Sequence, residues 1–275
     1  PARPPMATLS IPPNPDVTFG IEYLDDDLVI VTKRAGLVTQ PGKGHETDAL
    51  LNGLFDRFGP QLQNLGRDRD FGLLHRLDRE TSGLLVVALK GRAYDALREQ
   101  FAARAVRKYY WALVAKTPKE AAGVINKPIA EVDPKRPGDK KLAKIASPPL
   151  GKPAVTAWRV VQGGPLGALL ECRPLTGRLH QVRVHLEAVG CPIMGDGLYA
   201  PASVARAAPR LGLHAHRLAF DHPTTGQVID VRTPFPKDLR STLRLLRLDL
   251  PTVGQSSRPA EPDADDSAHD PAEPD

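Results

Sequence analysis

The chain has 275 residues, of which 41% are hydrophobic and 25% charged, enough for one large domain or two small ones with a real core. This composition excludes a wholly disordered chain, and the lack of any apolar run of about 18–20 residues excludes a membrane-spanning helix. Two cysteines are too few for a disulfide framework or a four-thiolate zinc site.

The cysteine count and the amino terminus bear on the compartment. Two thiols fit a reducing environment, where a cysteine usually packs as a small apolar side chain. The first residues, Pro-Ala-Arg-Pro-Pro, lack the apolar run of a signal peptide. We therefore expect a cytoplasmic protein.

The net charge of +5 is unevenly distributed along the chain. Residues 259–275 carry seven carboxylates and no lysine or arginine, so the net charge of the rest is +12. A net charge this positive on the rest of the chain favours a polyanionic partner, of which nucleic acid is the commonest. A charge surplus that serves only solubility explains the same number, so charge alone leaves nucleic-acid binding open.

The hydrophobic pattern predicts one folded domain over residues 19–250. The Pro-rich residues 1–18 and the Pro- and acid-rich residues 251–275 are predicted to be disordered, because they cannot bury enough surface to offset chain entropy. In chain order, apolar runs predict strands over 21–24, 28–32, 71–74, 84–89, 108–115, 155–161, 168–172, 211–220 and 227–231. Apolar residues at helical spacing predict helices over 92–104, 179–189 and 237–248.

The order of these elements predicts the fold class. Turn-forming residues 25–27 and 223–226 join consecutive strands, and strands joined by hairpins pair antiparallel. We expect an α+β fold, with a mixed, largely antiparallel central β-sheet and flanking helices.

Residues 75–83 form a short, charged and hydroxyl-rich loop between two strand-like runs. Loops held by rigid strands often carry catalytic groups. Asp78 is a carboxylate in an apolar frame, with Arg76 and Arg79 close enough in sequence to keep it ionised, and Thr81 offers a hydroxyl that fixes the loop. A charged, poorly solvated carboxylate is a usable nucleophile or base. A surface turn with a local Asp–Arg pair explains the same residues.

Residues 176–186 form a second polar segment, at the start of the predicted helix. Thr176 is a candidate cap, which would place Arg178 in the first helical turn. A cation is unfavourable there with respect to the helix dipole, so Arg178 needs a carboxylate or phosphate partner. His180 and His185 are five residues apart and do not share a helix face as metal ligands would.

Two further features are weaker signals. In the strand at 108–115, Tyr110 lies on one face with Ala112 and Val114, either as part of the core or as an aromatic that stacks on a base. Residues 133–153 hold six lysines and arginines against two aspartates, together with several prolines. They are predicted to form a surface loop, either merely solvated or in contact with phosphates.

The two polar segments together resemble the signatures of the RluA-type pseudouridine synthases. Residues 75–88 resemble the family's first motif, and residues 176–186 its Thr-Gly-Arg-x-His-Gln-x-Arg-Val-His-Leu motif. Residues 191–199 and 213–223 are similar to its Gly-Asp-x-Leu-Tyr and Leu-His-Ala…His-Pro stretches. Residues 151–156 also fit. The resemblance spans about residues 21–235, although Arg34 and Gln40 replace a proline and a histidine of the family pattern.

The resemblance implies an enzyme that isomerises uridine to pseudouridine in structured RNA, either ribosomal or transfer RNA. The base detaches at N1, turns and rejoins through C5, so no cofactor and no metal is expected. The family often carries an S4 RNA-binding module, but the Pro-rich residues 1–18 cannot hold one. We therefore expect no S4 domain and a catalytic domain that binds RNA by itself. We also expect the protein to be a monomer.

The resemblance also implies roles for single residues. Asp78 would be the nucleophile, Arg178 its ion-pair partner and Tyr110 the ring that packs on uracil. Arg76 would fill the stack vacated by the flipped base, because a planar guanidinium stacks well. Leu186 would close the apolar wall of the pocket, and Thr81 is the remaining candidate for substrate binding.

Two other functions remain open on the residues alone. A nucleosidase or nuclease site around Asp78 would need a second carboxylate or a metal to activate water, for which Glu80 and the histidines are candidates. A non-catalytic RNA-binding module is supported by charge alone. The intact segments 75–83 and 176–186 argue against the second alternative.

Overall fold

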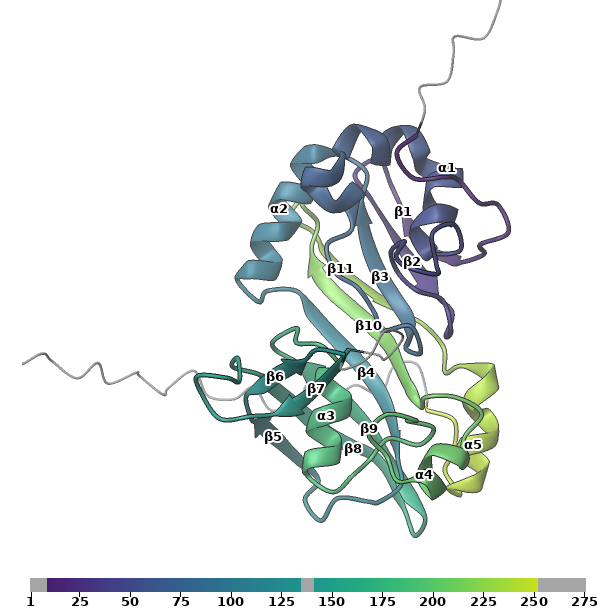
Figure 1. Ribbon diagram of the computed structural model, residues 1–275, viewed down its shortest axis with the longest axis vertical. Coiled ribbons are helices and arrows are strands. Elements are labelled where there is room, and N and C mark those ends of the chain that lie inside the picture. The colour runs from purple at the N-terminus through teal and green to yellow at the C-terminus, as the bar shows by residue number, and fades with distance from the viewer. Residues whose placement is uncertain (1–8, 135–140, 252–275) are drawn as a thin grey trace, which may run out of the picture.

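The computed structural model describes residues 9–134 and 141–251. Its main feature is a nine-stranded sheet in the order β1-β2-β3-β10-β4-β9-β8-β5, with β11 on the outer half of β10 (Figure 1). The strands are β1 (Gly20–Leu24), β2 (Leu28–Lys33), β3 (Ser82–Ala88), β4 (Arg107–Val114), β5 (Ala122–Asn126), β8 (Val155–Gly164), β9 (Gly167–Pro174), β10 (Leu213–Asp221) and β11 (Val228–Arg232). In this sheet, all strand pairs are antiparallel except β3 with β10. The predicted fold class is therefore confirmed.

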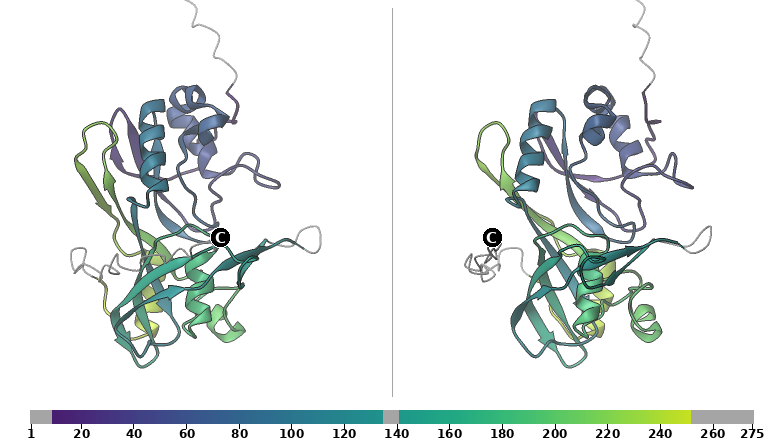
Figure 2. Two further views of the ribbon diagram at one scale, coloured as in Figure 1. Left: turned by 90° about the vertical axis from the view of Figure 1, so that its left-hand side faces the viewer. Right: turned by 60° about the vertical axis from the view of Figure 1, so that its left-hand side comes forward.

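The helices cover the sheet unequally. α1 (Leu50–Leu65), α2 (Gly91–Ala102) and α3 (Gln181–Ala188) lie on one face, and the 3-10 turn η2 (Lys237–Leu239) and α5 (Arg240–Leu245) pack on the other (Figure 2). Side chains along β4 point alternately to the two faces of the sheet. Tyr110 therefore packs in the core under α1 to α3, and Trp111 packs in the core under α5. α4 (Ala202–Arg206) is a single short turn. No described helix is long and apolar enough to cross a membrane.

A small hairpin stands apart from the main sheet. β6 (Ile129–Val132) pairs with β7 (Leu142–Ile145), and the hairpin packs on α3 through Ile129, Ala143 and Val184. The sequence analysis predicted a surface loop from residue 133 onward. Ala143 is buried here, so part of that stretch is a packed strand; residues 135–140 lie outside the described residues.

Two other local predictions were wrong. Residues 9–17, expected to be disordered, pack on α1: Val17 is buried, and the Asn52 side chain donates a hydrogen bond to the Pro12 carbonyl. The remaining parts of the predicted disordered ends, 1–8 and 252–275, lie outside the described residues. Residues 71–74 are not a strand, because η1 (Arg67–Gly72) is a 3-10 turn and only Leu73 bridges to β3.

Helix α1 was not predicted at all. Pro60 lies inside it, and Phe58 has non-helical backbone angles, so the helix is kinked in the middle. Gly53 and Gly59 weaken the helical pattern further. Both glycines allow close packing of the amino-terminal segment, since a Cβ at Gly53 would lie 2.5 Å from the Val17 carbonyl oxygen.

Gly83 is required where β3 meets β10. Its φ is +121°, and an added Cβ would lie 2.2 Å from the Ala215 carbonyl oxygen. We expect Gly83→Ala to lower the free energy of unfolding by at least about 2 kcal/mol, since backbone strain and a clash with a rigid strand add. Gly226→Ala is the matched control. Gly226 has a φ of +71° with open space around it, so the substitution should lower the free energy of unfolding by only about 1 kcal/mol. Urea unfolding of both variants measures the difference, and equal losses would contradict the clash.

Candidate active site

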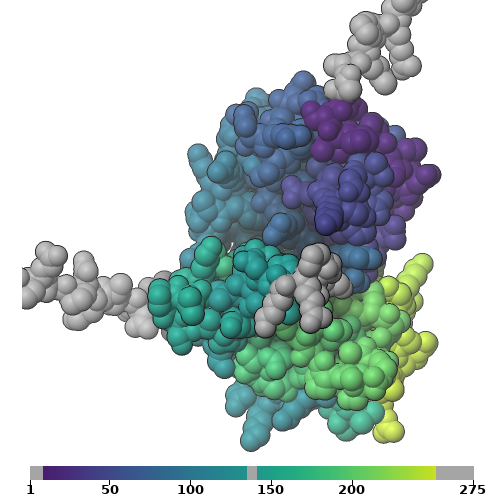
Figure 3. Space-filling view, in the orientation of Figure 1, coloured from purple at the N-terminus to yellow at the C-terminus, as the bar shows by residue number. Residues whose placement is uncertain are grey.

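A hollow of about 160 Å³ lies at the middle of the α1–α3 face, where four segments meet. The loop before β3 contributes Arg76, Asp78 and Thr81, and β4 contributes Lys108 and Tyr110. Residues 174–183, which run from the end of β9 into α3, form the opposite wall, and Glu131 of β6 closes the rim. In the space-filling view, the surface is recessed where the amino-terminal half meets the hairpin (Figure 3).

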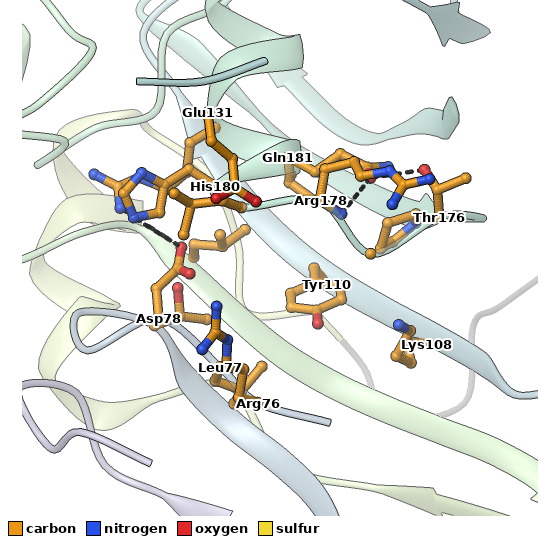
Figure 4. Close-up of a pocket in the computed structure, with 17 residues that line it drawn as sticks. Arg76, Leu77, Asp78, Lys108, Tyr110, Glu131, Thr176, Arg178, His180 and Gln181 are labelled. Carbon is orange, nitrogen blue, oxygen red and sulfur yellow. Dashed lines mark hydrogen bonds and ion pairs between the residues drawn. The ribbon is translucent and has the colours of Figure 1, made fainter. Parts of the chain in front are cut away.

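Asp78 faces Arg183 and His180 across this hollow, and Figure 4 shows Asp78 opposite His180. Its Oδ2 is 3.6 Å from Arg183 Nη1 and 4.0 Å from His180 Nε2, and a quarter of its side chain is exposed. Arg183 is only 3% exposed. The guanidinium is therefore close enough for a direct electrostatic attraction to the Asp78 carboxylate.

The predicted ion pair between Arg178 and Asp78 was wrong. Arg178 lies on the Thr176 side of the hollow, and its Nε donates a hydrogen bond to the Pro153 carbonyl (Figure 4). The reason is the start of α3, which begins at Gln181 rather than at Leu179. Arg178 therefore precedes the helix, and the first turn points Arg183 at Asp78.

Arg183 is itself held in place by Asp196. Its Nε and Nη2 donate to the two carboxylate oxygens of Asp196 at 2.8 and 2.7 Å, and its guanidinium lies 5.1 Å from the ring centroid of Tyr199. Burial raises the pKa of the Asp196 carboxyl, but the hydrogen bonds and charge of Arg183 outweigh burial and hold that pKa below its usual range. Nη1 is left to face Asp78.

His180 is the second residue that the sequence analysis did not select. It precedes α3 with a left-handed backbone (φ 51°), which is unusual for a residue other than glycine. Its Nδ1 is hydrogen-bonded to the Tyr199 hydroxyl at 2.7 Å, and the same hydroxyl accepts the N–H of Ala143 in β7. Strained residues of this kind cluster at functional sites, and here the strain places an imidazole next to Asp78.

The turn before α3 is organised by Gln181. Its Oε1 accepts hydrogen bonds from the Thr176 hydroxyl and the Arg178 N–H, and its Nε2 donates to Val155 O and Thr156 Oγ1. Thr176 therefore does not cap the helix as predicted. The motif residues in this turn instead fix the wall of the hollow to β8.

Lys33 fixes the opposite loop. Its side chain is fully buried, and Nζ donates to the carbonyls of Arg34, Leu37 and Arg79. Burial lowers the pKa of this lysine to about 7, while the charges of Asp78 and Glu80 raise it. The ammonium thus ties residues 34–37 to the loop that carries Asp78.

The other predicted site residues are placed as follows. Tyr110 lines the hollow, and burial, with the charge of Asp78, raises the pKa of its phenol. Arg76 lies exposed at the rim. Thr81 lines the hollow, and its N–H donates to the Asp78 carbonyl. Leu186 does not line it: this side chain is fully buried in the main core, and Val182, one turn earlier, lines the hollow instead.

The remaining histidines in the motifs have structural partners. His185 bonds to Thr156 Oγ1 and the Lys127 carbonyl, and His75 Nε2 accepts the Val86 N–H. Burial lowers the pKa of His75 to about 3, so its ring is neutral. Among residues 9–134 and 141–251, no three His, Cys, Asp or Glu side chains gather as they would around a metal ion.

Comparison with known proteins identifies the family. The family described as RNA pseudouridylate synthase matches residues 27–188. The chain belongs to the RNA pseudouridine synthases of the RluA type. It is therefore an isomerase that acts on RNA, and the four segments around Asp78 are the candidate active site of a pseudouridine synthase.

Individual pseudouridine synthases are similar over most of this chain. An uncharacterized RNA pseudouridine synthase of Synechocystis is 37% identical, covering 86% of this chain and 71% of its own. A protein of Zymomonas mobilis named ribosomal large subunit pseudouridine synthase D is 35% identical, covering 85% and 74%. The solved structure of human RNA pseudouridylate synthase domain containing 4 has a TM-score of 0.64 at 28% identity, covering 85% of this chain and 95% of that one.

The Arg183–Asp196 pair yields a stability prediction. Asp196→Asn leaves a buried guanidinium without its carboxylate, so we expect the free energy of unfolding at pH 7 to fall by about 3 kcal/mol. Because the pKa of Asp196 is lowered in the folded protein, this stabilisation is present above about pH 4 and is lost as the pH falls through the folded value. The difference in the free energy of unfolding between wild type and Asp196→Asn should therefore become smaller below about pH 4.

Asp238→Asn is the control for this prediction. Asp238 also forms a two-point pair, with Arg210, but the carboxylate is 57% exposed, so its loss should cost less than about 1 kcal/mol. Urea unfolding at pH 7 and pH 3.5, followed by circular dichroism, measures both variants. If both variants lost the same free energy of unfolding, the burial of Arg183 would not be what makes Asp196→Asn destabilising.

Proposed function

We propose that this pseudouridine synthase modifies a uridine of large-subunit ribosomal RNA, with Asp78 as the nucleophile and the uridine flipped into the hollow beside it. The observation that carries the proposal is a partly exposed carboxylate that faces a buried guanidinium, Arg183, in a hollow walled by Tyr110. The ribosomal substrate is supported by relatives named ribosomal large subunit pseudouridine synthase D.

The chemistry requires a charged Asp78. The N1–C1′ bond breaks, the base turns and a C5–C1′ bond forms, while C5 loses a proton and N1 gains one. Attack at C6 of the base and attack at C1′ of the sugar both need an ionised carboxylate. Arg183 supplies a positive charge beside this carboxylate, and His180 Nε2 faces the same carboxylate oxygen.

Tyr110 serves as a wall for the base in this proposal. Its raised pKa keeps the phenol protonated at neutral pH, so it does not act as a base in its resting state. The ring contributes an apolar face next to Leu77, Val182 and Leu213 of the same hollow. A flat base fits between this face and the turn before α3.

Arg76 supports flipping of the base. It lies exposed at the rim of the hollow, two residues before Asp78, and no described carboxylate forms an ion pair with it. A planar guanidinium in that place can occupy the gap that the extruded uridine leaves in the RNA stack. Extrusion costs a few kcal/mol, which the arginine would offset in part.

The nucleophile is tested with Asp78→Asn. We expect the variant to bind RNA at least as tightly as wild type, because a negative charge is lost, and to form pseudouridine at least about 10³-fold more slowly. Asp56→Asn, on the exposed side of α1, is the control and should react at the wild-type rate. Release of tritium from C5-labelled RNA measures the rate, and wild-type turnover by Asp78→Asn would refute the role.

The flipping role is tested with Arg76→Ala. The rate should fall by at least about tenfold on a folded RNA hairpin, but much less on an RNA in which the target uridine is already unpaired and unstacked. Arg92→Ala, on α2, is the control for loss of an exposed arginine. An equal loss on both RNAs would assign Arg76 to general binding instead of flipping.

A further inference from the structure

A second hollow, of about 390 Å³, adjoins the candidate active site on the side of α2. Arg76, Lys108 and residues 176–178 line both hollows, so the two lie side by side. The far wall of the second hollow comes from the end of α2, with Phe101 and Arg104. A strand of RNA with one nucleotide in the first hollow would therefore bring its neighbouring nucleotide close to the second.

The second hollow is positively charged. Among the residues that the structure describes, Arg76, Arg104, Lys108 and Arg178 line it, and no carboxylate does; Glu131 lines only the first hollow. A concave surface lined by several cations, with no carboxylate to neutralise them, attracts the negatively charged phosphodiester backbone.

Lys108 lacks a partner of opposite charge. Within residues 9–134 and 141–251, no carboxylate forms an ion pair with it, and its Nζ lies 5.6 Å from the ring centroid of Phe101. Burial lowers the pKa of this lysine. A desolvated cation without an anion is unfavourable, and an incoming phosphate would compensate it.

Arg104 occupies a position where glycine is preferred. It follows α2 with a φ of 58°, its N–H donates to the Phe101 carbonyl, and the next N–H, of Ala105, donates to Gln100 O. A residue with a Cβ is strained in this left-handed conformation, which glycine adopts at no steric cost.

We propose that the second hollow binds the sugar–phosphate backbone of the nucleotide next to the target uridine, with Arg104 and Lys108 as phosphate contacts. This inference rests on the proposed function, since the strand must continue from a uridine held beside Asp78. Contacts to phosphate carry no base information, so the hollow adds affinity and register without sequence specificity.

Arg104→Gly is a sharp test because it relieves strain and removes the charge together. The variant should melt at or above the wild-type temperature, yet bind an in vitro transcript of large-subunit ribosomal RNA about three- to tenfold more weakly at moderate salt. The slope of log K against log salt should decrease by about 1. The single-turnover rate at saturating RNA should stay close to that of wild type.

Arg247→Gly is the matched control. Arg247 has the same left-handed backbone (φ 56°) after α5, with the same pattern of N–H bonds to Arg244 O and from Leu248 to Leu243 O. It lies on the opposite side of the sheet, so its variant should gain stability equally and keep wild-type binding. Arg104→Gln, which removes the charge but keeps the strain, covers the case in which glycine changes the local fold.

The outcomes separate this inference from the proposed function. If wild type forms no pseudouridine in the transcript, the proposed ribosomal substrate fails, whatever the variants do. If wild type is active and both Arg104 variants bind with the affinity and salt slope of Arg247→Gly, the second hollow does not contact the backbone. Weaker binding by Arg104→Gly and Arg104→Gln alone supports it.

Discussion

Asp78 faces a guanidinium that cannot leave its place. Arg183 is buried, and two of its nitrogens are committed to Asp196, so the third is left to face Asp78. Moving Arg183 away would leave an uncompensated carboxylate at Asp196, which the interior does not tolerate. The protein thus uses a buried ion pair as a fixed source of positive field for a carboxylate at the edge of solvent.

The surroundings of this pair are rigid on every side. Gln181 fixes the turn before α3. Lys33 donates hydrogen bonds to three carbonyls and so ties residues 34–37 to the loop that bears Asp78. Tyr199 contacts Arg183 with its ring and joins His180 to the N–H of Ala143 in the β6–β7 hairpin through its hydroxyl. The position of the hairpin is therefore coupled to both Arg183 and His180, the two residues that face Asp78, which holds the site in one geometry before substrate arrives.

The elements that the sequence analysis missed share a physical cause. α1 contains Pro60 and two glycines, which obscure a helical pattern that tertiary packing nevertheless stabilises. Strands β6 and β7 have four residues each, too few to show alternation. Strand β5 (Ala122–Asn126) of the main sheet was also missed. By contrast, the other strands of the main sheet, with their longer apolar runs, and helix α2 were predicted to within a few residues.

The sequence by itself determined the class of fold and, through its motifs, the family, because alternation and motifs are properties of neighbouring residues. The resemblance to that family implied that Asp78 and Tyr110 serve one site, and both line the same hollow. It did not determine which arginine meets Asp78. Arg178 and Arg183 stand in one motif, and the choice between them depends on where α3 begins. That start is decided by hydrogen bonds from Gln181 to β8 and by the contact of Arg183 with Asp196, thirteen residues later, and such contacts exist only once the chain has folded.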